Sequence, residues 1–369
     1  LDLSFICGLI FFMNALRGGR AFRLRSGDIL PSIGLGTFTG TRHTQKAAKT
    51  GPGGTMEQCV TKWIQLGGRM IDCAQNYLNE AEIGDGIARC IRDGTTKREE
   101  LFVSSKLNNP YHEPDNVRPA LEKTLLDLGL DYVDMYLIHW PVAFVHVPFE
   151  ADPRYESGRG FAESYEPDQC SAVTGKLWSE TNWASTGVMP PHLMTGVTIH
   201  DTWRAMVEVQ KMGLAKNVGV CNMNVQLLHE LCAGNPFSMP SLLQCESHPY
   251  LQQDGLINYC RMQGIQFQAY SPLGYGEFKG DTEISPVLDE VIKEIAAKHS
   301  VSAAQVCLRW TNQRGVATMP FTLKENEMVE NLNIFDFTLD DNDMQRMQGL
   351  DLGHHYLRPE AWYGLPYWS

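Results

Sequence analysis

Residues 70–80 read MIDCAQNYLNE, residues 101–107 read LFVSSKL and residues 133–141 read VDMYLIHWP. Each stretch contains an apolar run, typical of a buried strand, with a reactive polar side chain at or just after its end. Those side chains are Asp72, Tyr77, Lys106 and His139. In a barrel of repeated strand–helix units, the loops after the strands converge on one mouth, where active sites lie. The three stretches therefore predict an enzyme built on such a barrel.

The same alternation runs through most of the chain. The run SIGLG at 32–36 opens it, and four more apolar runs follow residue 200, which brings the expected strands to about eight. Those four runs are AKNVGVCN (215–222), LLQCES (242–247), IQFQAYS (265–271) and GVATMP (315–320), and amphipathic stretches predict helices over 56–66, 79–92, 115–128, 201–211, 225–232, 255–262, 287–298 and 303–310. The expected fold class is α/β, a (β/α)8 TIM barrel. A doubly wound dinucleotide fold is not favoured, because no GxGxxG separates a strand from a helix.

Three segments lie outside the repeat. Residues 1–27 hold an apolar stretch that is too short to span a bilayer and is followed, not preceded, by arginines. We expect this extension to lie outside the fold, with a trimmed signal-anchor as the alternative, and residues 28–369 to form a single barrel domain. The long insertion 142–197 follows the fourth strand, and we expect it to rise over the barrel mouth. The aromatic C-terminal tail after Leu350 is expected either to cross the same opening or to lie on the surface.

Composition disfavours several classes of partner. The chain of 369 residues has a formal net charge of -12, whereas nucleic acids and anionic membranes attract basic patches. Its 10 cysteines are scattered without a CxxC pair, so we expect neither a disulfide framework nor a metal site. Unpaired cysteines fit a reducing compartment. We therefore expect a cytoplasmic monomer without a nucleic-acid or membrane partner.

The four polar residues suit the reduction of a carbonyl group. Such a reduction needs a hydride donor at the carbon and a proton donor near the oxygen. Tyr77 is the expected proton donor, and Lys106 supplies the positive charge that favours its phenolate. Asp72 would pair with the otherwise costly buried ammonium. His139, as a neutral imidazole, would hydrogen-bond the carbonyl oxygen.

Each of these residues also has an ordinary structural role. Asp72 can cap a turn, Tyr77 can pack, Lys106 can be exposed and His139 can be a core histidine. Four such residues at successive strand ends are harder to assign to packing, so a site is favoured. A Schiff base between a lysine and pyridoxal phosphate is a rival chemistry, but the chain lacks an obvious glycine-rich phosphate cup.

Short motifs in order along the chain carry a resemblance to a known family. The motifs are IGLGTF (33–38), IDCAQNYLNE (71–80), SSKL (104–107), LIHWP (137–141), GVCN (219–222), ESHPYLQQ (246–253), AYSPLG (269–274) and ENLNIFDF (330–337). From about residue 30 to residue 350 the chain resembles the aldo-keto reductase superfamily, in particular its aldose and xylose reductases. The resemblance implies a barrel that reduces aldehydes, including aldoses, and ketones with NADPH or NADH, with the four residues in the roles given above.

The resemblance also implies a cofactor site. Asn222 and Gln244 would hold the nicotinamide carboxamide, Tyr270 would stack beneath the ring, and Cys221 stands where the family usually has serine. The implied cofactor-binding residues are Thr37, Asp72, Cys221, Asn222, Gln244, Tyr270, Ser271, Pro272, Leu273, Gly274, Thr322, Leu323, Glu330 and Asn331.

Two departures leave the choice between NADP(H) and NAD(H) open. Phe321 and Glu327 replace the lysine and arginine that the family ordinarily uses for the 2'-phosphate of NADPH. An anion there opposes a phosphate, although Lys324 can compensate in part. Glu327 can instead accept a hydrogen bond from a ribose hydroxyl, as acidic residues do in other NAD sites.

The substrate site follows from the same alignment of motifs. Phe38 and Trp140 would form apolar walls beside Tyr77 and His139, and the substrate is expected to be an aldose or another small carbonyl compound. A slow nucleotide-sensing or scaffolding barrel is the alternative function. The altered phosphate-binding positions and the large insertion favour that alternative, whereas the intact Tyr77 and Lys106 favour the enzyme.

Overall fold

The computed structural model describes residues 19–38, 56–146, 148–149, 196–235, 238–274 and 284–357. Most of the insertion expected over 142–197, the beginning of the chain and the end of the aromatic tail lie outside the described residues. No helix within the described ranges is long and apolar enough to cross a membrane.

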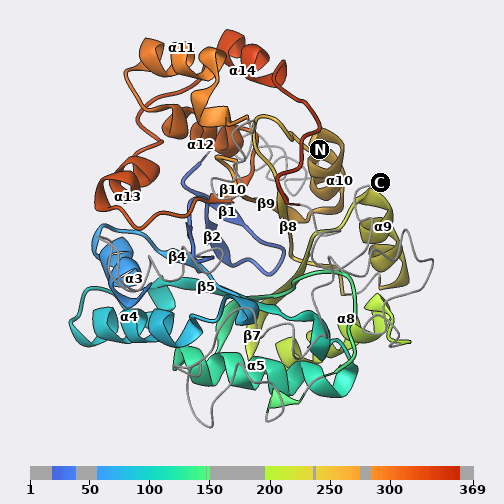
Figure 1. Cartoon of the computed structure of the whole chain (residues 1–369). Helices are drawn as coiled ribbons and strands as arrows, with labels where there is room; N and C mark the ends of the chain where they lie inside the picture. The colour runs from blue at the N-terminus through green and yellow to red at the C-terminus, as the bar shows by residue number, and fades with distance from the viewer. Residues whose placement is uncertain are drawn as a thin grey trace, which may run out of the picture.

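Eight parallel strands form the centre of the molecule (Figure 1). They follow one another in chain order, and each pairs with the next in parallel register. A parallel bridge between Ile33 and Thr318 joins the first strand region to the last, so the sheet closes on itself. The predicted (β/α)8 barrel is therefore confirmed. The strands are β3 (Leu35–Gly36), β4 (Met70–Asp72), β5 (Phe102–Leu107), β6 (Val133–Ile138), β7 (Ala215–Cys221), β8 (Leu242–Glu246), β9 (Gln266–Tyr270) and β10 (Ala317–Met319).

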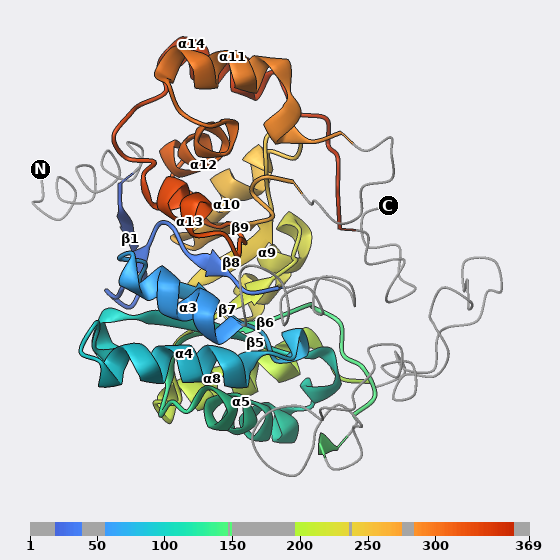
Figure 2. The same ribbon diagram turned by 60° about the vertical axis from the view of Figure 1, so that its left-hand side comes forward.

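Helices cover the outside of the strands, as the amphipathic stretches predict (Figure 2). Most of their apolar faces pack against the outward side chains of the barrel and form one large buried cluster with them. The helices are α3 (Met56–Gln65), α4 (Glu80–Arg92), α5 (Pro114–Leu128), α8 (Ile199–Lys211), α9 (Val225–Gly234), α10 (Asp254–Gln263), α11 (Glu290–His299) and α12 (Ala303–Gln313). Two further helices, α13 (Glu325–Leu332) and α14 (Asp341–Gln348), follow the last strand and were not predicted. The buried apolar residues of α11 and most of those of α12 form a second cluster with α14.

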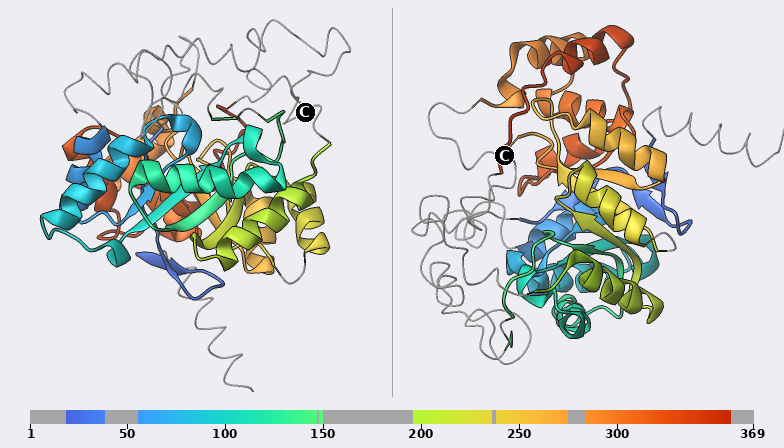
Figure 3. Two further views of the ribbon diagram at one scale, coloured as in Figure 1. Left: turned by 90° about the horizontal axis from the view of Figure 1, so that it is seen from below. Right: turned by 90° about the vertical axis from the view of Figure 1, so that its right-hand side faces the viewer.

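A hairpin closes one end of the barrel. Strand β1 (Ala21–Arg23) pairs antiparallel with β2 (Ile29–Pro31), and the hairpin projects from that end in Figure 3. Phe22 and Leu24 are buried in a cluster that includes Met70, the first residue of β4. The hairpin thus seals the amino-terminal end of the strands. The hairpin begins within the segment 1–27, and Phe22 and Leu24 of that segment contribute to the buried cluster.

One glycine is required by the closeness of two strands. A Cβ atom on Gly219 of β7 would lie 2.4 Å from the carbonyl oxygen of Leu242 and 2.8 Å from Cδ2 of Leu137. Both approaches are shorter than real contacts of Cβ atoms allow. The glycine of the GVCN motif therefore lets β7 pack between β6 and β8, two residues before the side chains of the site begin.

Candidate active site

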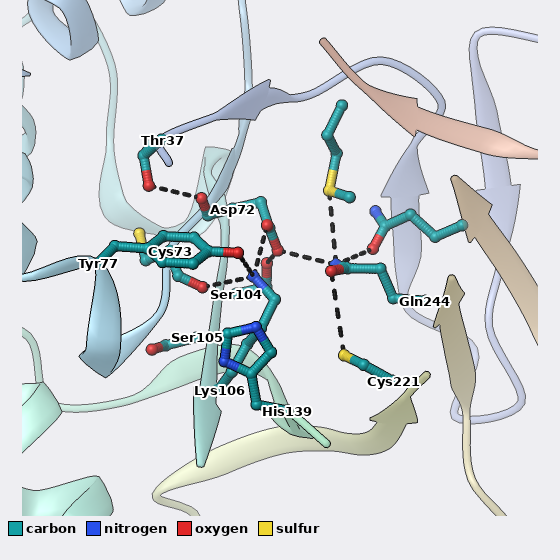
Figure 4. Close-up of polar contacts among 12 residues, drawn as sticks. Thr37, Asp72, Cys73, Tyr77, Ser104, Ser105, Lys106, His139, Cys221 and Gln244 are labelled. Atoms are coloured by element: carbon teal, nitrogen blue, oxygen red, sulfur yellow. Dashed lines mark hydrogen bonds and ion pairs between the residues drawn. The ribbon is translucent and has the colours of Figure 1, made fainter. Parts of the chain in front are cut away.

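Four polar residues meet at the carboxyl end of neighbouring strands. Asp72 ends β4, Lys106 lies near the end of β5, and His139 follows β6 directly. Tyr77 lies on a single turn of 3-10 helix, η1 (Gln75–Tyr77), in the loop after β4. Figure 4 shows the four side chains directed toward one another. The structure thus brings together all four residues that the sequence predicts to be catalytic.

The loop that carries Tyr77 is tied to the barrel on both sides. The hydroxyl of Thr37, just after β3, donates to the carbonyl oxygen of Asp72 at 2.8 Å. The side-chain amide of Asn79 donates in turn to the carbonyl oxygen of Thr37 at 2.8 Å. Leu78 takes the left-handed conformation with φ 64°, which ends η1 and starts the turn into α4. These contacts fix the backbone on either side of the phenol.

Lys106 and Asp72 form a buried ion pair. Nζ of Lys106 lies 2.6 Å from Oδ2 of Asp72 and donates to the carbonyl oxygen of Cys73 at 2.8 Å. The other carboxylate oxygen, Oδ1, accepts from the hydroxyl of Ser104 at 2.7 Å and from Nε2 of Gln244 at 3.0 Å. A buried charge is stable only when it is paired and hydrogen-bonded. Both charges meet that condition here.

The same ammonium contacts the phenol. Nζ of Lys106 lies 3.3 Å from the hydroxyl oxygen of Tyr77 and 4.8 Å from the centre of its ring. Burial raises the pKa of Tyr77 to about 12, although the positive charge of Lys106 opposes this rise. Burial by itself lowers the pKa of Lys106, but Asp72 and Tyr77 outweigh it and raise the pKa above its usual value. At neutral pH the site therefore holds a protonated phenol beside a charged amine.

His139 completes the group as a neutral imidazole. Burial, and then the positive charge of Lys106, lower its pKa well below the usual value. Its ring packs edge-on to Tyr77 with centroids 5.6 Å apart. Nδ1 of the ring is buried and has no hydrogen-bond partner within the described residues. The imidazole therefore keeps hydrogen-bonding capacity for another molecule, and it carries no charge that competes with Tyr77 for the proton.

The residues expected around a nicotinamide group lie beside these four. Asn222 follows β7 in the left-handed conformation with φ 58°, and its Nδ2 donates to the carbonyl oxygen of His139 at 2.8 Å. The phenol of Tyr270 donates to Oδ1 of Asn222 at 2.7 Å. The thiol of Cys221 is 3.9 Å from Oε1 of Gln244, a weak contact that leaves this oxygen available. A planar amide-bearing ring fits this surface, because the aromatic face of Tyr270 and the available amide oxygen of Gln244 are present together.

The other expected cofactor residues form separate groups at the same end of the strands. Ser271 to Gly274 turn away from β9, and Ser271 has a left-handed backbone with φ 49°. Thr322 and Leu323 lie in the loop after β10, and Glu330 and Asn331 lie on α13, which packs beside α3. The residues after β10 and on α13 form a second group, apart from the four catalytic candidates. A long ligand would place its far end there.

The two departures from the family pattern are in this second group. Phe321 is exposed, with 39% of its surface accessible. Glu327, on the first turn of α13, accepts from the hydroxyl of Thr322 and from Nζ of Lys324 at 2.8 Å. Burial raises the pKa of Glu327, but its contacts with Lys324 and Thr322 outweigh burial and lower the pKa below its ordinary value. Glu327 is therefore an anion that pairs with the nearby lysine.

Two aromatic residues flank the phenol and the imidazole. The ring of Phe38 is 5.0 Å from that of Tyr77, and the ring of Trp140 is stacked 6.5 Å from that of His139. Phe38 is exposed, whereas Trp140 is buried. Both lie beside the proposed catalytic groups, and their role as apolar walls of a substrate pocket stays a prediction.

Several residues of the site were not predicted from the sequence. Ser104, which donates to Asp72, lies two residues before Lys106 and so points to the same side of β5. That spacing is a signal that sequence reasoning can use. Gln268, which contacts Gln244, lies two residues before Tyr270 and gives the same signal. Glu80 and its partners Ser105 and Thr124 face the surrounding helices. Glu80 and Ser105 lie within the quoted motifs, but no role was predicted for them.

A (β/α)8 barrel with an aspartate, a phenol, an amine and a neutral imidazole at its mouth defines a class of enzymes, the carbonyl-reducing barrels. The model of the aldo/keto reductase family matches residues 32–352. The chain therefore belongs to the aldo/keto reductase family, and it is an oxidoreductase that reduces carbonyl groups with NAD(P)H.

Individual relatives match the sequence of this chain along nearly their whole length. The chain is 36% identical over 353 residues to the NAD(P)H-dependent D-xylose reductase I,II of Candida tropicalis, covering 93% of this chain and 96% of the relative. It is 37% identical over 360 residues to an aldo/keto reductase of Synechocystis, covering 96% of each chain. It is 35% identical over 361 residues to the NADH-dependent D-xylose reductase of Candida parapsilosis, covering 96% of this chain and 99% of the relative. These relatives do not favour the alternative of a sensing or scaffolding barrel.

Proposed function

We propose that this protein reduces the aldehyde group of an aldose such as D-xylose to the alcohol, with NADH as the preferred hydride donor. The observation that carries the proposal is the contact of Lys106 with both Asp72 and Tyr77, beside the neutral ring of His139. The sugar is proposed because several similar relatives are named D-xylose reductases.

The roles of the residues follow from their contacts. A bound nicotinamide cofactor supplies the hydride. Tyr77 donates the proton of its hydroxyl to the carbonyl oxygen, and the ammonium of Lys106 stabilises the phenolate that remains. Asp72 holds Lys106 in place and in its charged form. His139 hydrogen-bonds the carbonyl oxygen and orients the aldehyde between the walls formed by Phe38 and Trp140.

The preference for NADH rests on the charge of the loop after β10. A 2'-phosphate at neutral pH carries close to two negative charges and is bound best by arginine and lysine. Here Phe321 is uncharged, and Lys324 is already paired with Glu327. The adjacent anion weakens the attraction of Lys324 for a phosphate, whereas a carboxylate suits a ribose hydroxyl.

Steady-state turnover of the purified protein tests this proposal. We expect oxidation of NADH when D-xylose or an aromatic aldehyde is added, and a lower kcat/KM with NADPH. The Tyr77→Phe variant is the control, because it keeps the ring but lacks the proton donor. We expect it to bind NADH normally and to turn over about 100-fold more slowly or worse. Turnover of Tyr77→Phe at the wild-type rate would refute the mechanism, and a higher kcat/KM with NADPH would refute the cofactor preference.

We propose a cytoplasmic location, because all eight cysteines within the described ranges are free and buried. We propose a monomer on the separate ground of the acidic net charge of -12, which opposes self-association. Sedimentation of the purified protein tests the monomer, since a dimer would have twice the mass of 41.5 kDa.

A further inference from the structure

A chain of side-chain amides inside the barrel leads to the catalytic ion pair. Gln268 on β9 and Gln244 on β8 lie opposite one another in register. Both are buried, with 1% and 2% of their surfaces accessible. Nε2 of Gln244 donates to Oε1 of Gln268 at 3.0 Å and to Oδ1 of Asp72 at 3.0 Å. Both N–H groups of the Gln244 amide therefore donate hydrogen bonds, one to Asp72 and one to Gln268.

The orientation of Gln244 depends on Gln268. A primary amide has two N–H donors and one carbonyl acceptor, so an amide turned the other way would direct its oxygen at the carboxylate. The surrounding interior is lined by Met70, Met319 and Leu242, which offer at best a thioether. The sulfur of Met319 lies 3.6 Å from the same nitrogen of Gln244 and is a much weaker acceptor than an amide oxygen. Among the residues that the structure describes, Gln268 thus supplies the only strong acceptor near the second N–H.

Gln268 is itself held in one orientation. Its Nε2 lies 3.5 Å from the sulfur of Met70, the first residue of β4, on another strand of the barrel. The contacts therefore run from Met70 through Gln268 and Gln244 to Asp72, and they start and end on β4. A closed set of contacts of this kind restricts the rotation of each member.

We infer that Gln268 is a positioning residue for the reaction: it orients Gln244 so that the amide donates to Asp72, and it thereby sets how strongly Lys106 assists proton transfer by Tyr77. Asp72 accepts from Lys106, Ser104 and Gln244. When a donor to a carboxylate is lost, its negative charge is less compensated. The uncompensated charge of Asp72 opposes formation of the phenolate of Tyr77, because the two groups share the same ammonium. The inference rests on the proposed function, since it concerns the proton donor of that reaction.

Gln268→Met is the test variant. Methionine has nearly the same length and volume and suits an interior already lined by methionine, but it lacks the amide oxygen. Gln266→Met is the matched control on the same strand, because Gln266 is only half-buried and its amide donates to the carbonyl oxygens of Phe267 and Gly315. Both variants lose an amide from β9, and only one loses the contact with Gln244.

The pH dependence of alcohol oxidation is the first readout, because Tyr77 must be a phenolate to accept the proton in that direction. We expect the rising limb of kcat to move to higher pH by about half a unit or more in Gln268→Met. Reduction at neutral pH should be about three- to tenfold slower. The Gln266→Met profile should superimpose on the wild type. Superposition of the Gln268→Met profile as well would overturn the inference.

Two further measurements keep the test decisive. Met70→Leu conserves volume and removes the thioether that holds Gln268, so we expect a smaller shift in the same direction even where Gln268→Met fails to fold. The second is hydrogen exchange of the Gln244 side-chain amide by NMR on protein without cofactor, which should be faster in Gln268→Met. If the wild type lacks turnover, the proposed function fails, but the exchange rate of the Gln244 amide still tests the inference. An exchange rate in Gln268→Met equal to that of the wild type overturns the inference.

Discussion

Nζ of Lys106 lies 2.6 Å from Oδ2 of Asp72, and the lysine side chain is fully shielded from solvent. An ammonium in such a place is stable because the carboxylate compensates it. The pair therefore has two effects: it keeps the barrel interior electrically neutral, and it places a positive charge beside the hydroxyl of Tyr77.

Replacing Lys106 should reveal both effects. In Lys106→Met the carboxylate of Asp72 stays buried without its partner, and we expect the free energy of unfolding to fall by about 3–5 kcal/mol. Turnover should fall by about 100-fold or more, because the phenolate loses its stabilising charge. Urea unfolding and steady-state kinetics measure the two losses.

A double variant separates the two effects. Lys106→Met with Asp72→Asn removes both charges, so much of the lost stability should return while turnover remains low. Turnover that recovers together with stability would show that the ammonium acts only through folding.

The charge of the loop after β10 should control the choice of cofactor. Phe321→Lys combined with Glu327→Arg adds two cations, removes an anion and frees Lys324 from its pair. We expect the KM for NADPH to fall by about tenfold or more, with a smaller change for NADH. Glu325→Arg is the control, because Glu325 lies on the same turn of α13 but pairs with Lys62. An equal gain from the control would mean that net charge alone matters.

Glu80 should make stability depend on pH. Its carboxylate accepts from Ser105 at 2.6 Å and Thr124 at 3.1 Å in the layer between the barrel and its helices. Burial raises its pKa from 4.5 to about 7. The folded state therefore holds the proton more tightly than the unfolded state, and this contribution to stability is lost as pH rises from about 4.5 to about 7.

The Glu80→Gln variant tests this dependence, because glutamine remains neutral. Between about pH 5 and pH 8 the difference in unfolding free energy should change in favour of the variant, by at most about 3 kcal/mol. Urea unfolding at several pH values measures it, with Glu99→Gln, on the exposed η2 (Arg98–Glu100), as the control. A difference that is constant with pH in Glu80→Gln would contradict the expectation.

The hairpin should stabilise the barrel without taking part in catalysis. Phe22 is 5% exposed and packs against the amino-terminal ends of the strands, opposite to the site. We expect Phe22→Ala to lower the free energy of unfolding by about 3–4 kcal/mol and to leave kcat of the folded protein unchanged. Ile29→Ala, on the paired strand, should cost far less, because Ile29 is 51% exposed. Chemical unfolding of both variants decides this, and equal losses would show that the hairpin does not seal the core.

Much of the fold was predictable because it is periodic. Buried parallel strands read as short apolar runs and amphipathic helices repeat every 3.6 residues, so eight strands and eight of the helices follow from the sequence. The hairpin was missed because β1 (Ala21–Arg23) has only one buried residue among its three, which gives too weak a pattern. Helix α14 was missed for a similar reason, since it buries only Asp343 and Met347.

The sequence by itself determined the identity and order of Asp72, Tyr77, Lys106 and His139, because the ends of successive parallel strands must meet at one mouth. The tertiary structure alone decided which groups surround them. Gln244 reaches Asp72 from 172 residues away, and Gln268 reaches Met70 from 198 residues away. The physical reason is that strand periodicity fixes the side to which a side chain points, whereas barrel closure fixes which side chains it meets there.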